Sequence, residues 1–486
     1  MKRAAIFGYI TLITAGLFAL FHARGYDDPY ITFRYAQNFA AGNGLVYNPG
    51  EHVLSTTAPL WALILSIFAK MGVSLPLAAN FISALAVAVG GLMLVLLGRQ
   101  WRTPWQGYGA ALAYPLFPLL MSTFGSETPL YLALALAAMF AYSQRAWSLT
   151  ALLSALATLA RPDAVLVPLV LGAHFVWAEV WRVKTPIPWR AALLFAAVLL
   201  AWALPAWWYY GSPLPVTLAA KQAQGLMSIS QTFLPGFGRV VGWYTRYPYT
   251  LMAALAVVGV LWSLYRRSAW LLLLGWSAVY FAAYTILGVS AYFWYYAPLV
   301  PGFVAAAALG IQAGVEMATH PKAARLFGGG AAPLSPRWLP WGFGLALWVA
   351  LLPFAARHLW AAHLQNDARL LVYRAAGEWL NANTPQDAAV GMLEVGIVGY
   401  YAQRPVVDFA GLIQPAVARQ IQPDWTYETS ALWALETYRP PFVLLHDGLF
   451  TAVEQRLADW GCAAVANFTG SEYNYTANLT IYNCKE

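Results

Sequence analysis

Two adjacent carboxylates, Asp27 and Asp28, follow directly on the first apolar segment of the chain, residues 4–21. An apolar run of this length predicts a membrane-spanning helix, which would place both acids at the boundary between membrane and water. Leaving a charge unpaired near lipid costs on the order of several kcal/mol, so an acid kept at such a boundary indicates a functional site. Repulsion between neighbouring carboxylates favours one of them as a proton acceptor. The pair therefore predicts a general base that removes a proton from a hydroxyl group.

A further acid, Glu127, lies in the stretch 125–129 (Gly-Ser-Glu-Thr-Pro), which the predicted topology places on the same side of the membrane. Asp27, Asp28 and Glu127 are therefore the candidate catalytic residues. A structural role is the alternative for each of them, because an acid close before a proline is a common helix N-cap. A cap before Pro29 would use only one acid, however, and would leave the second unexplained.

Three basic residues, Arg161, Lys221 and Arg246, are predicted on the outer side, against the usual bias of Lys and Arg toward the cytoplasm. A lipid-linked phosphate needs donors that match its charge, so we expect these residues to bind the phosphate of such a substrate. Two alternatives remain open. The long side chains could reach ordinary phospholipid head groups, and Arg161 could form a structural pair with Asp163.

Aromatic and polar residues of the external loops complete the predicted site, because aromatic rings suit sugars or a polyprenyl chain. The residues that we expect to contact substrate are Tyr30, Arg34, His52 and Tyr292. The aromatic stretches 207–209 and 292–296 are equally typical of a membrane-interface belt. An adjacent Asp pair offers too few ligands to predict a divalent metal, and no metal site is predicted.

Composition sets the class of protein. Hydrophobic residues make up 60% of the 486 residues, charged residues make up 10%, and the mean hydropathy is +0.56. Soluble domains carry about 25% charged residues, so this composition predicts a polytopic α-helical membrane protein. The net charge of +8 is attributed to basic loops on the cytoplasmic side and not to a surface that binds nucleic acid.

The hydropathy pattern predicts about 11 spans and a cytoplasmic N-terminus. The predicted spans are 4–21, 75–98, 104–123, 129–144, 146–160, 164–178, 191–210, 248–265, two within 268–315, and 338–356. The apolar segment 53–69 is predicted to be a re-entrant or interfacial helix of the first external loop, residues 24–74. Counting it as a span would place eight Arg and Lys residues of later loops outside, against the positive-inside tendency.

Residues 358–486 are predicted to form a small extracytoplasmic α/β domain after a transmembrane catalytic domain at 1–357, since 13 of the 20 acidic residues lie beyond Arg357. Strand-like runs and helical spacing alternate there. The strand-like runs are 390–394, 406–410, 442–446, 463–468 and 479–482, and the helical stretches are 369–381 and 450–460. Both cysteines, Cys462 and Cys484, lie in this domain and predict one disulfide in an oxidising compartment. Two unpaired thiols are the alternative.

The motifs resemble those of GT-C class glycosyltransferases, which are polytopic membrane enzymes that use polyprenyl-phosphate sugars. The likeness is greatest to the mycobacterial terminal arabinofuranosyltransferase branch, beside the superfamily of protein mannosyltransferases and aminoarabinose transferases. It is carried by residues 27–36 (Asp-Asp-Pro-Tyr-Ile-Thr-Phe-Arg-Tyr-Ala), 42–51, 125–129, 161–163, and 215–217 with Lys221. The resemblance implies that Asp27 is the general base, that Asp28 and Glu127 assist it, and that Arg161 and Lys221 lie near the donor phosphate.

The reaction that the resemblance implies is an inverting single displacement by a hexosyl- or pentosyltransferase. A sugar would pass from a polyprenyl phosphate to an acceptor hydroxyl on a glycan, lipid or protein at the outer face of the cell membrane. The expected partners are the donor, the acceptor and membrane lipids, with no cofactor and no nucleic acid. Val216 replaces the Asn of the family pattern, and Tyr295-Tyr296 replaces its Arg-Tyr, so the identity of the sugar is not implied.

Two rival functions remain. A transporter or flippase of lipid-linked sugars would also need spans and outer charges, but transporters place polar groups within spans, whereas the charges here fall in loops. A non-catalytic envelope assembly protein would use the C-terminal domain to dock a partner.

Overall fold

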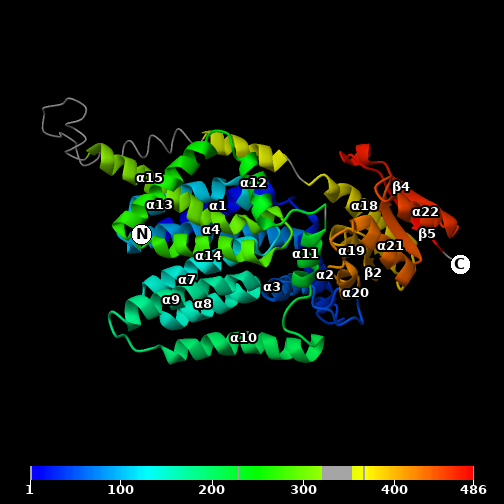
Figure 1. Ribbon diagram of the computed structural model, residues 1–486, viewed down its shortest axis with the longest axis horizontal. Coiled ribbons are helices and arrows are strands. Elements are labelled where there is room, and N and C mark those ends of the chain that lie inside the picture. The colour runs from blue at the N-terminus through cyan, green and yellow to red at the C-terminus, as the bar shows by residue number, and fades with distance from the viewer. Residues whose placement is uncertain (1–2, 228, 320–352, 365–366, 485–486) are drawn as a thin grey trace.

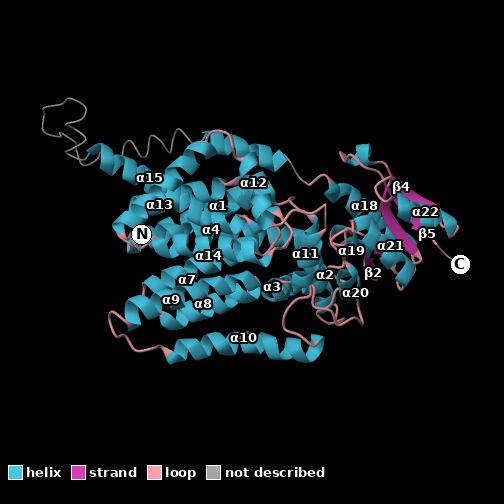
Figure 2. Cartoon of the chain, viewed as in Figure 1, coloured by secondary structure: helices cyan, strands magenta, loops and turns pink. Residues whose placement is uncertain are grey.

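The computed structural model describes residues 3–227, 229–319, 353–364 and 367–484. Helices form one elongated block, and a mixed sheet with its own helices lies at one end of the block (Figure 1, Figure 2). The first-loop helices α2 (Asp27–Ala40) and α3 (Pro59–Lys70) lie between the block and the sheet (Figure 1). The protein is therefore mainly helical, as its composition predicts.

Six helical segments among the described residues are long and apolar enough to cross a membrane. They are Arg3–Phe21 (α1), Leu75–Gln100 (α4), Pro162–Val180 (η2, α9 and η3), Trp189–Tyr210 (α10), Tyr249–Arg266 (α13) and Phe293–Met317 (η4, η5 and most of α15, Val300–Thr319). Shorter apolar helices pack against them: α7 (Thr128–Ser143), α8 (Trp147–Ala160) and α14 (Leu271–Leu287). The predicted span 338–356 falls largely outside the described residues, so the count of about 11 spans stays a prediction.

The segment predicted to be re-entrant or interfacial forms the 12-residue helix α3, which begins at Pro59. Proline is favoured at this first helical position because its missing N–H group would have no partner there. At 1.5 Å per residue the helix is about 18 Å long, which is too short for a hydrocarbon core of about 30 Å. The length of α3 agrees with a segment that does not span, and its depth in a membrane stays a prediction.

The predicted span 104–123 is broken in the middle. Helix α5 (Pro104–Ala113) is followed by the 3-10 turn η1 (Tyr114–Leu116) and by the short helix α6 (Pro118–Met121). Pro115 and Pro118 lack N–H groups and therefore interrupt the helical hydrogen-bond ladder. The chain then turns through a loop that presents Glu127 at the N-terminus of α7.

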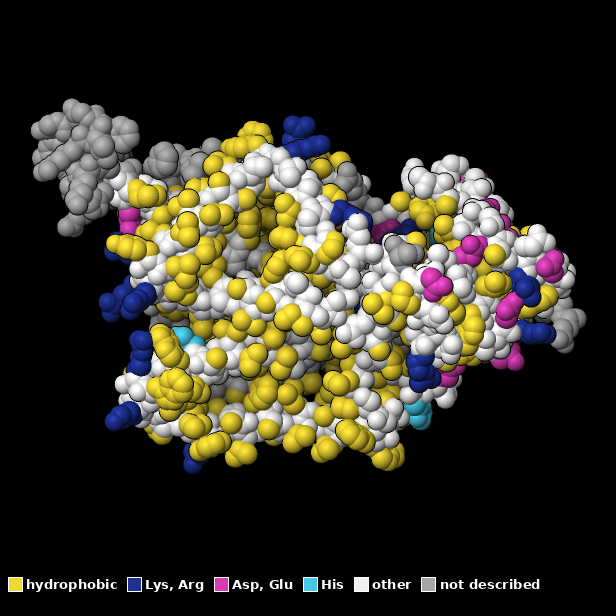
Figure 3. Space-filling model, viewed as in Figure 1, with side chains coloured by type: hydrophobic (Ala, Val, Ile, Leu, Met, Phe, Trp, Pro, Cys, Tyr) yellow, Lys and Arg dark blue, Asp and Glu magenta, His cyan; other side chains and the backbone are white. Residues whose placement is uncertain are grey.

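Charge is unevenly distributed along the molecule. Basic side chains gather at the end of the helical block away from the sheet, whereas acidic side chains gather on the sheet domain (Figure 3). Arg99 and Arg266 lie in the last turns of α4 and α13, and Arg102 and Arg267 lie in the loops that follow these helices. This separation is the pattern that the positive-inside rule predicts for a sheet domain on the outer side. The orientation of the termini stays a prediction.

The C-terminal domain contains a five-stranded sheet in the order β2-β1-β3-β5-β4. The strands are β1 (Val390–Met392), β2 (Val406–Asp408), β3 (Phe442–His446), β4 (Ala463–Phe468) and β5 (Leu479–Asn483), each within or overlapping a run predicted as a strand. Strands β2, β1 and β3 run parallel, and β5 is antiparallel to β3 and β4. Its helices are α18 (Arg369–Asn383), α19 (Ile397–Ala402), α20 (Pro415–Gln420), α21 (Tyr427–Tyr438) and α22 (Thr451–Asp459). Cys462 and Cys484 form a disulfide, as predicted.

The first loop and the C-terminal domain share one apolar core. Tyr30 and Phe33 of α2 belong to the same buried cluster as Val372 of α18 and Ile397 of α19. Burial of such side chains from both segments favours their association by roughly 25 cal/mol per Å² of apolar surface. The loop therefore packs as part of the C-terminal domain, although most of the helical block separates the two in sequence.

Asn48→Ala should lower the stability of this joint unit. The Asn48 side chain donates to the carbonyl of Val406 at 3.0 Å and accepts from its N–H at 2.9 Å, inside the interface with β2. Losing these bonds leaves two buried backbone groups unsatisfied, at a cost on the order of 1–3 kcal/mol each. We expect a lower midpoint of thermal unfolding, measured by intrinsic fluorescence in detergent. Asn43→Ala is the matched control, because Asn43 is exposed in the same loop; equal shifts would contradict this role for Asn48.

Candidate active site

A cavity of about 290 Å³ is lined by residues of α2, η2 (Pro162–Val165), α11 (Thr217–Leu226) and α14. Its polar lining is Asp28, Thr57, Glu127, Arg161, Asp163, Thr217, Lys221, Tyr284, Trp294 and Tyr295. Its apolar lining includes Val165, Leu214, Leu218 and Leu287, which are between 38% and 69% exposed on the helical block. We call these four residues the apolar rim. The cavity thus combines a charged interior with a rim that would meet lipid in a membrane.

Asp28 and Lys221 face one another across this cavity. Nζ of Lys221 lies 3.3 Å from Oδ1 of Asp28, which belongs to the first turn of α2. The Asp28 side chain is 36% exposed, whereas that of Lys221 is 9% exposed. The pair can therefore be reached from the carboxylate side.

Lys221 keeps its charge in this setting. Burial alone would lower the pKa of Lys221, but the Asp28 carboxylate and the Tyr295 hydroxyl outweigh burial and raise the pKa above its ordinary value. The ring centroids of Tyr292, Trp294 and Tyr295 lie 5.2, 5.3 and 5.5 Å from Nζ, within the range of cation–π attraction. The ammonium group is therefore a stable cation at neutral pH.

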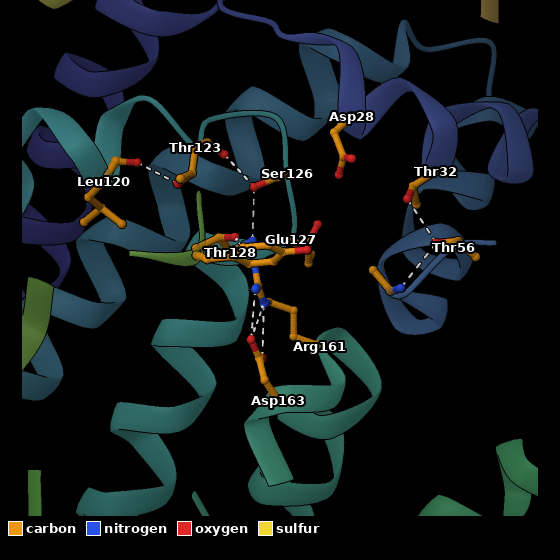
Figure 4. Close-up of polar contacts among 12 residues, drawn as sticks. Asp28, Thr32, Thr56, Leu120, Thr123, Ser126, Glu127, Thr128, Arg161 and Asp163 are labelled. Carbon is orange, nitrogen blue, oxygen red and sulfur yellow. Dashed lines mark hydrogen bonds and ion pairs between the residues drawn. The ribbon is translucent and has the colours of Figure 1, made fainter. Parts of the chain in front are cut away.

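Arg161 is the centre of a cluster of polar contacts that includes Glu127, Thr128 and Asp163 (Figure 4). Its guanidinium pairs with Asp163 at 2.9 Å and with Glu127 at 3.3 Å. It also donates to the Thr128 hydroxyl at 3.0 Å and to the Tyr284 hydroxyl at 3.1 Å. Nε and both terminal nitrogens of Arg161 thus each have at least one hydrogen-bond partner. The structural pair with Asp163, considered as an alternative for Arg161, is therefore present, and Arg161 also lines the cavity.

Helix capping does not explain the predicted catalytic acids. Glu127 occupies the N-cap position of α7, but its side chain makes no capping hydrogen bond. The N-cap of α2 is Tyr26, also without a side-chain cap, so neither Asp27 nor Asp28 caps its own helix. Burial raises the pKa of Glu127, and the nearby Arg161 opposes that rise. Glu127 is thus a largely buried carboxyl whose pKa is raised by burial, with Arg161 opposing that rise.

Asp27 points away from the cavity. Its carboxylate accepts hydrogen bonds from the backbone N–H groups of Gly396, at 2.9 Å, and Ile397, at 2.8 Å, at the start of α19. Burial and the neighbouring Glu394 raise the pKa of Asp27 to about 7, against the effect of these two amides. Successive residues of a helix point about 100° apart, so Asp27 and Asp28 cannot face the same space. Asp28 therefore lines the cavity and Asp27 does not, and the role of base predicted for Asp27 stays a prediction.

None of the residues predicted to contact substrate lines this cavity, although Tyr292 lies beside Lys221. Tyr30 is buried against Phe33 and Tyr400. Arg34 is buried with its Nε 3.4 Å from the Tyr47 carbonyl. These side chains belong to the core that joins the first loop to the C-terminal domain.

His52 and Arg246 both lie on the surface. His52 is exposed and stacks on Tyr209, with ring centroids 4.1 Å apart. Arg246 is exposed between α12 (Phe233–Trp243) and α13 and does not line the cavity. The expectation that Arg246 binds the donor phosphate therefore has no support from its position.

Sequence reasoning missed several lining residues, notably Tyr284 and Thr57. Tyr284 lies within the apolar helix α14, and no charged residue lies near it in sequence that would single it out. The tyrosine hydroxyl within a mostly apolar run was the signal that could have indicated Tyr284. Thr57 lies in the loop before α3, beyond the end of the motif stretch 42–51.

Metal ligation has limited support from the side chains present. Among the described residues, no group of three or more His, Cys, Asp or Glu side chains is arranged to hold a metal ion. Asp28 and Glu127 are both on the cavity, but Glu127 is paired with Arg161. The prediction that no cofactor is needed is not tested by this arrangement.

The helical block, the helical first loop and the C-terminal α/β domain together have the GT-C fold of membrane glycosyltransferases. The structure of ArnT from Cupriavidus metallidurans bound to undecaprenyl phosphate is similar over 99% of this chain and 98% of that one, with a TM-score of 0.60 and 14% identity. The archaeal oligosaccharyltransferase AglB from Archaeoglobus fulgidus, in complex with an inhibitory peptide and a dolichol-phosphate, covers 100% of this chain and 75% of its own, with a TM-score of 0.61 and 13% identity.

Sequence similarity points to the same class. A terminal β-(1→2)-arabinofuranosyltransferase of Mycobacterium tuberculosis is 28% identical over 258 residues, which are 48% of this chain and 39% of that relative. The match thus spans less than half of the relative's length. Residues 360–482 match a family model described as a domain of unknown function (DUF8728). The predicted resemblance to GT-C glycosyltransferases is confirmed, and the apolar helices support a multi-pass membrane protein.

Arg161→Lys should destabilise the protein far more than a surface substitution of the same kind. A lysine cannot reproduce the planar fork that joins Glu127, Asp163 and Tyr284, and carboxylates left buried without their partner cost roughly 3 kcal/mol or more. We expect a lower thermal midpoint in detergent. Arg145→Lys is the control, because the Arg145 side chain is 60% exposed in its pair with Glu179. A small, equal effect of both substitutions would show that the Arg161 cluster is not what holds this part of the fold.

Proposed function

We propose that this protein is a membrane glycosyltransferase that moves a sugar from a polyprenyl-phosphate donor to an acceptor hydroxyl, with Asp28 as the general base. The observation that carries the proposal is the Asp28–Lys221 pair, a carboxylate and a cation 3.3 Å apart on one cavity with an apolar rim. The ligands named for two proteins of the same fold, undecaprenyl phosphate and dolichol-phosphate, support a donor of this chemical class.

Lys221 is assigned to the donor phosphate. A lysine binds phosphate as a compact charge, and the ion pair of Lys221 with Asp28 can be exchanged for a phosphate oxygen that enters the cavity. Arg161 is already bonded to protein partners, so it contributes positive charge nearby. Fixed cations of this kind stabilise the negative charge that develops on the leaving phosphate.

The apolar rim is assigned to the polyprenyl chain. The exposed side chains of Leu214, Leu218 and Leu287 lie on the same cavity as the charged residues. A prenyl chain laid over them would bury apolar surface from both molecules and would leave its phosphate beside Lys221. A membrane-embedded donor could therefore reach the charged interior from the side.

The chemical step is a single displacement at the anomeric carbon. When the donor phosphate replaces Asp28 as the ion-pair partner of Lys221, the Asp28 carboxylate is free to accept the proton of an acceptor hydroxyl. The acceptor oxygen forms the new bond to the anomeric carbon as the bond to the phosphate oxygen breaks. The electron pair of the broken bond leaves with the polyprenyl phosphate, and the configuration of the sugar inverts. Glu127, paired with Arg161, would contribute to the electrostatic environment of the anomeric carbon.

Asp28→Asn should reduce transfer by roughly 100- to 10,000-fold, because the amide cannot accept the acceptor proton. The measurement is transfer of radiolabelled sugar from a panel of polyprenyl-phosphate sugars by purified protein, with a pentofuranosyl donor tested first. That choice follows the name of the sequence relative. Asp27→Asn and Glu127→Gln are assayed beside it and are expected to retain more activity.

The same assay separates the rival functions. Loss of turnover in Asp27→Asn with activity kept in Asp28→Asn would make Asp27 the base. Turnover with none of the donors would contradict a transferase, and movement of a lipid-linked sugar across vesicles would then favour the flippase.

Lys221→Met should weaken binding of undecaprenyl phosphate by roughly 10- to 100-fold, the range expected for loss of one charged hydrogen bond. Lys221→Arg should restore part of the affinity, because it restores the charge. Lys70→Met is the matched control, since Lys70 is exposed at the end of α3. Affinity can be measured by ligand-induced thermal stabilisation, and an unchanged affinity in Lys221→Met would remove Lys221 from the phosphate site.

A further inference from the structure

We propose that the C-terminal domain positions the Asp28–Lys221 pair by gripping α2 at Asp27 and α11 at Gln224. Asp27 and Gln224 are then positioning residues, and the inference rests on the proposed function for its catalytic meaning. Each of the two grips is a buried polar contact between a helix that carries one member of the pair and a backbone segment of the sheet domain.

The grip on α2 is made by the residue next to Asp28. Both carboxylate oxygens of Asp27 accept backbone N–H groups, from Gly396 at 2.9 Å and from Ile397 at 2.8 Å. The approach is close, because a Cβ on Gly396 would lie 1.9 Å from the backbone oxygen of Asp27. The first turn of α2 is thereby held against the start of α19.

The grip on α11 lies on the same face as Lys221, three residues along the helix. The Gln224 side chain is 1% exposed and donates to the Ala410 carbonyl at 2.9 Å. Its own carbonyl oxygen accepts from the Tyr292 hydroxyl at 3.2 Å, and Tyr292 is part of the aromatic surround of Lys221. Movement of α11 would therefore disturb both Lys221 and its surround.

Both grips arise from one edge of the sheet. Strands β1 and β2 are adjacent and parallel, with Met392 opposite Asp408. Gly396 follows the end of β1, and Ala410 follows the end of β2. The carboxyl ends of adjacent parallel strands lie at the same edge, so the separation of the two gripping segments is set by the sheet.

The segment that grips α11 is itself rigidly held. The buried Asp408 carboxylate accepts from the N–H groups of Ala410, at 2.7 Å, and Ile413, at 2.8 Å. The distance between α2 and α11 is therefore imposed by a hydrogen-bonded frame. A base and a phosphate-binding cation need such a fixed spacing, because a displacement of about 1 Å can reduce a rate by roughly 100-fold.

Gly396→Ala tests the grip on α2 without touching the cavity. The φ of Gly396 is −71°, which alanine adopts readily, so the substitution acts through contact with Asp27. We expect kcat to fall roughly 10- to 100-fold with the KM for donor changed by less than about twofold and with the pH–rate profile unchanged, since Asp28 remains the base. Gly275→Ala is the control, because a Cβ there would meet nothing within 4 Å. An unchanged kcat in a protein with a lowered thermal midpoint would make the contact merely structural and would overturn the proposal.

A double-mutant cycle separates positioning from a direct role of Asp27. Asp27→Asn and Gly396→Ala break the same contact, so the double variant should be no slower than the slower single variant. Effects on kcat that multiply, or a pH–rate profile shifted by Gly396→Ala, would show that Asp27 acts in the chemistry and would overturn the positioning role. Gln224→Met, which breaks the other grip, should lower kcat with the KM for donor again nearly unchanged.

Hydrogen exchange tests the grips independently of turnover. Asp27→Asn should speed amide exchange in the peptide that contains Gly396 and Ile397, and Gln224→Met should speed exchange in α11. Faster exchange in these segments with transfer intact would overturn positioning while the transferase stands. If the wild-type protein transfers no sugar, the proposed function fails, and slow exchange at 396–397 that depends on Asp27 would still support the grip.

Discussion

The Arg161 guanidinium is 4% exposed among apolar helices, and a buried charge of this kind is tolerated only when its hydrogen-bonding groups are satisfied. Its partners are Glu127 and Thr128 at the start of α7, Asp163 in the 3-10 helix after α8, and Tyr284 in the last turn of α14. These contacts tie together the elements that form the walls of the cavity. The shape of the site therefore depends on satisfying the hydrogen-bonding groups of Arg161. The more exposed parts of the site surround this residue.

The second cation of the cavity is held in a different way. Lys221 has one carboxylate partner, Asp28, whose side chain is 36% exposed, together with a surround of aromatic rings. Arg161 is held by several protein partners, whereas Lys221 has one carboxylate partner that a ligand can replace. The first keeps the helices in place at all times, whereas the second can give up its carboxylate to a phosphate. That division explains how one small cavity can be both stable and open to ligand.

The C-terminal domain takes part in this arrangement. Residues 360–482, which match a domain of unknown function, pack with the first loop in one apolar core, and they also contact α11 through Ala410. The ends of two parallel strands thus reach the two helices that carry Asp28 and Lys221. Proteins of the same fold retain the overall architecture at 13% and 14% identity, which is expected when packing of helices and sheet, and not particular side chains, specifies the fold.

The sequence by itself determined the apolar helices, the strand segments, the disulfide and four of the charged residues on the cavity, Asp28, Glu127, Arg161 and Lys221. Each of these follows from local pattern: hydropathy, alternation, or a charge out of place beside an apolar run. Only the tertiary structure shows that Asp28, and not Asp27, lines the cavity, because the face that α2 turns to the cavity depends on backbone amides 369 and 370 residues away. For the same reason, the sequence did not single out Tyr284, which lies within an apolar helix, and did not show that Tyr30 and Arg34 are buried. Periodicity tells which residues share a face, whereas long-range packing decides what that face meets.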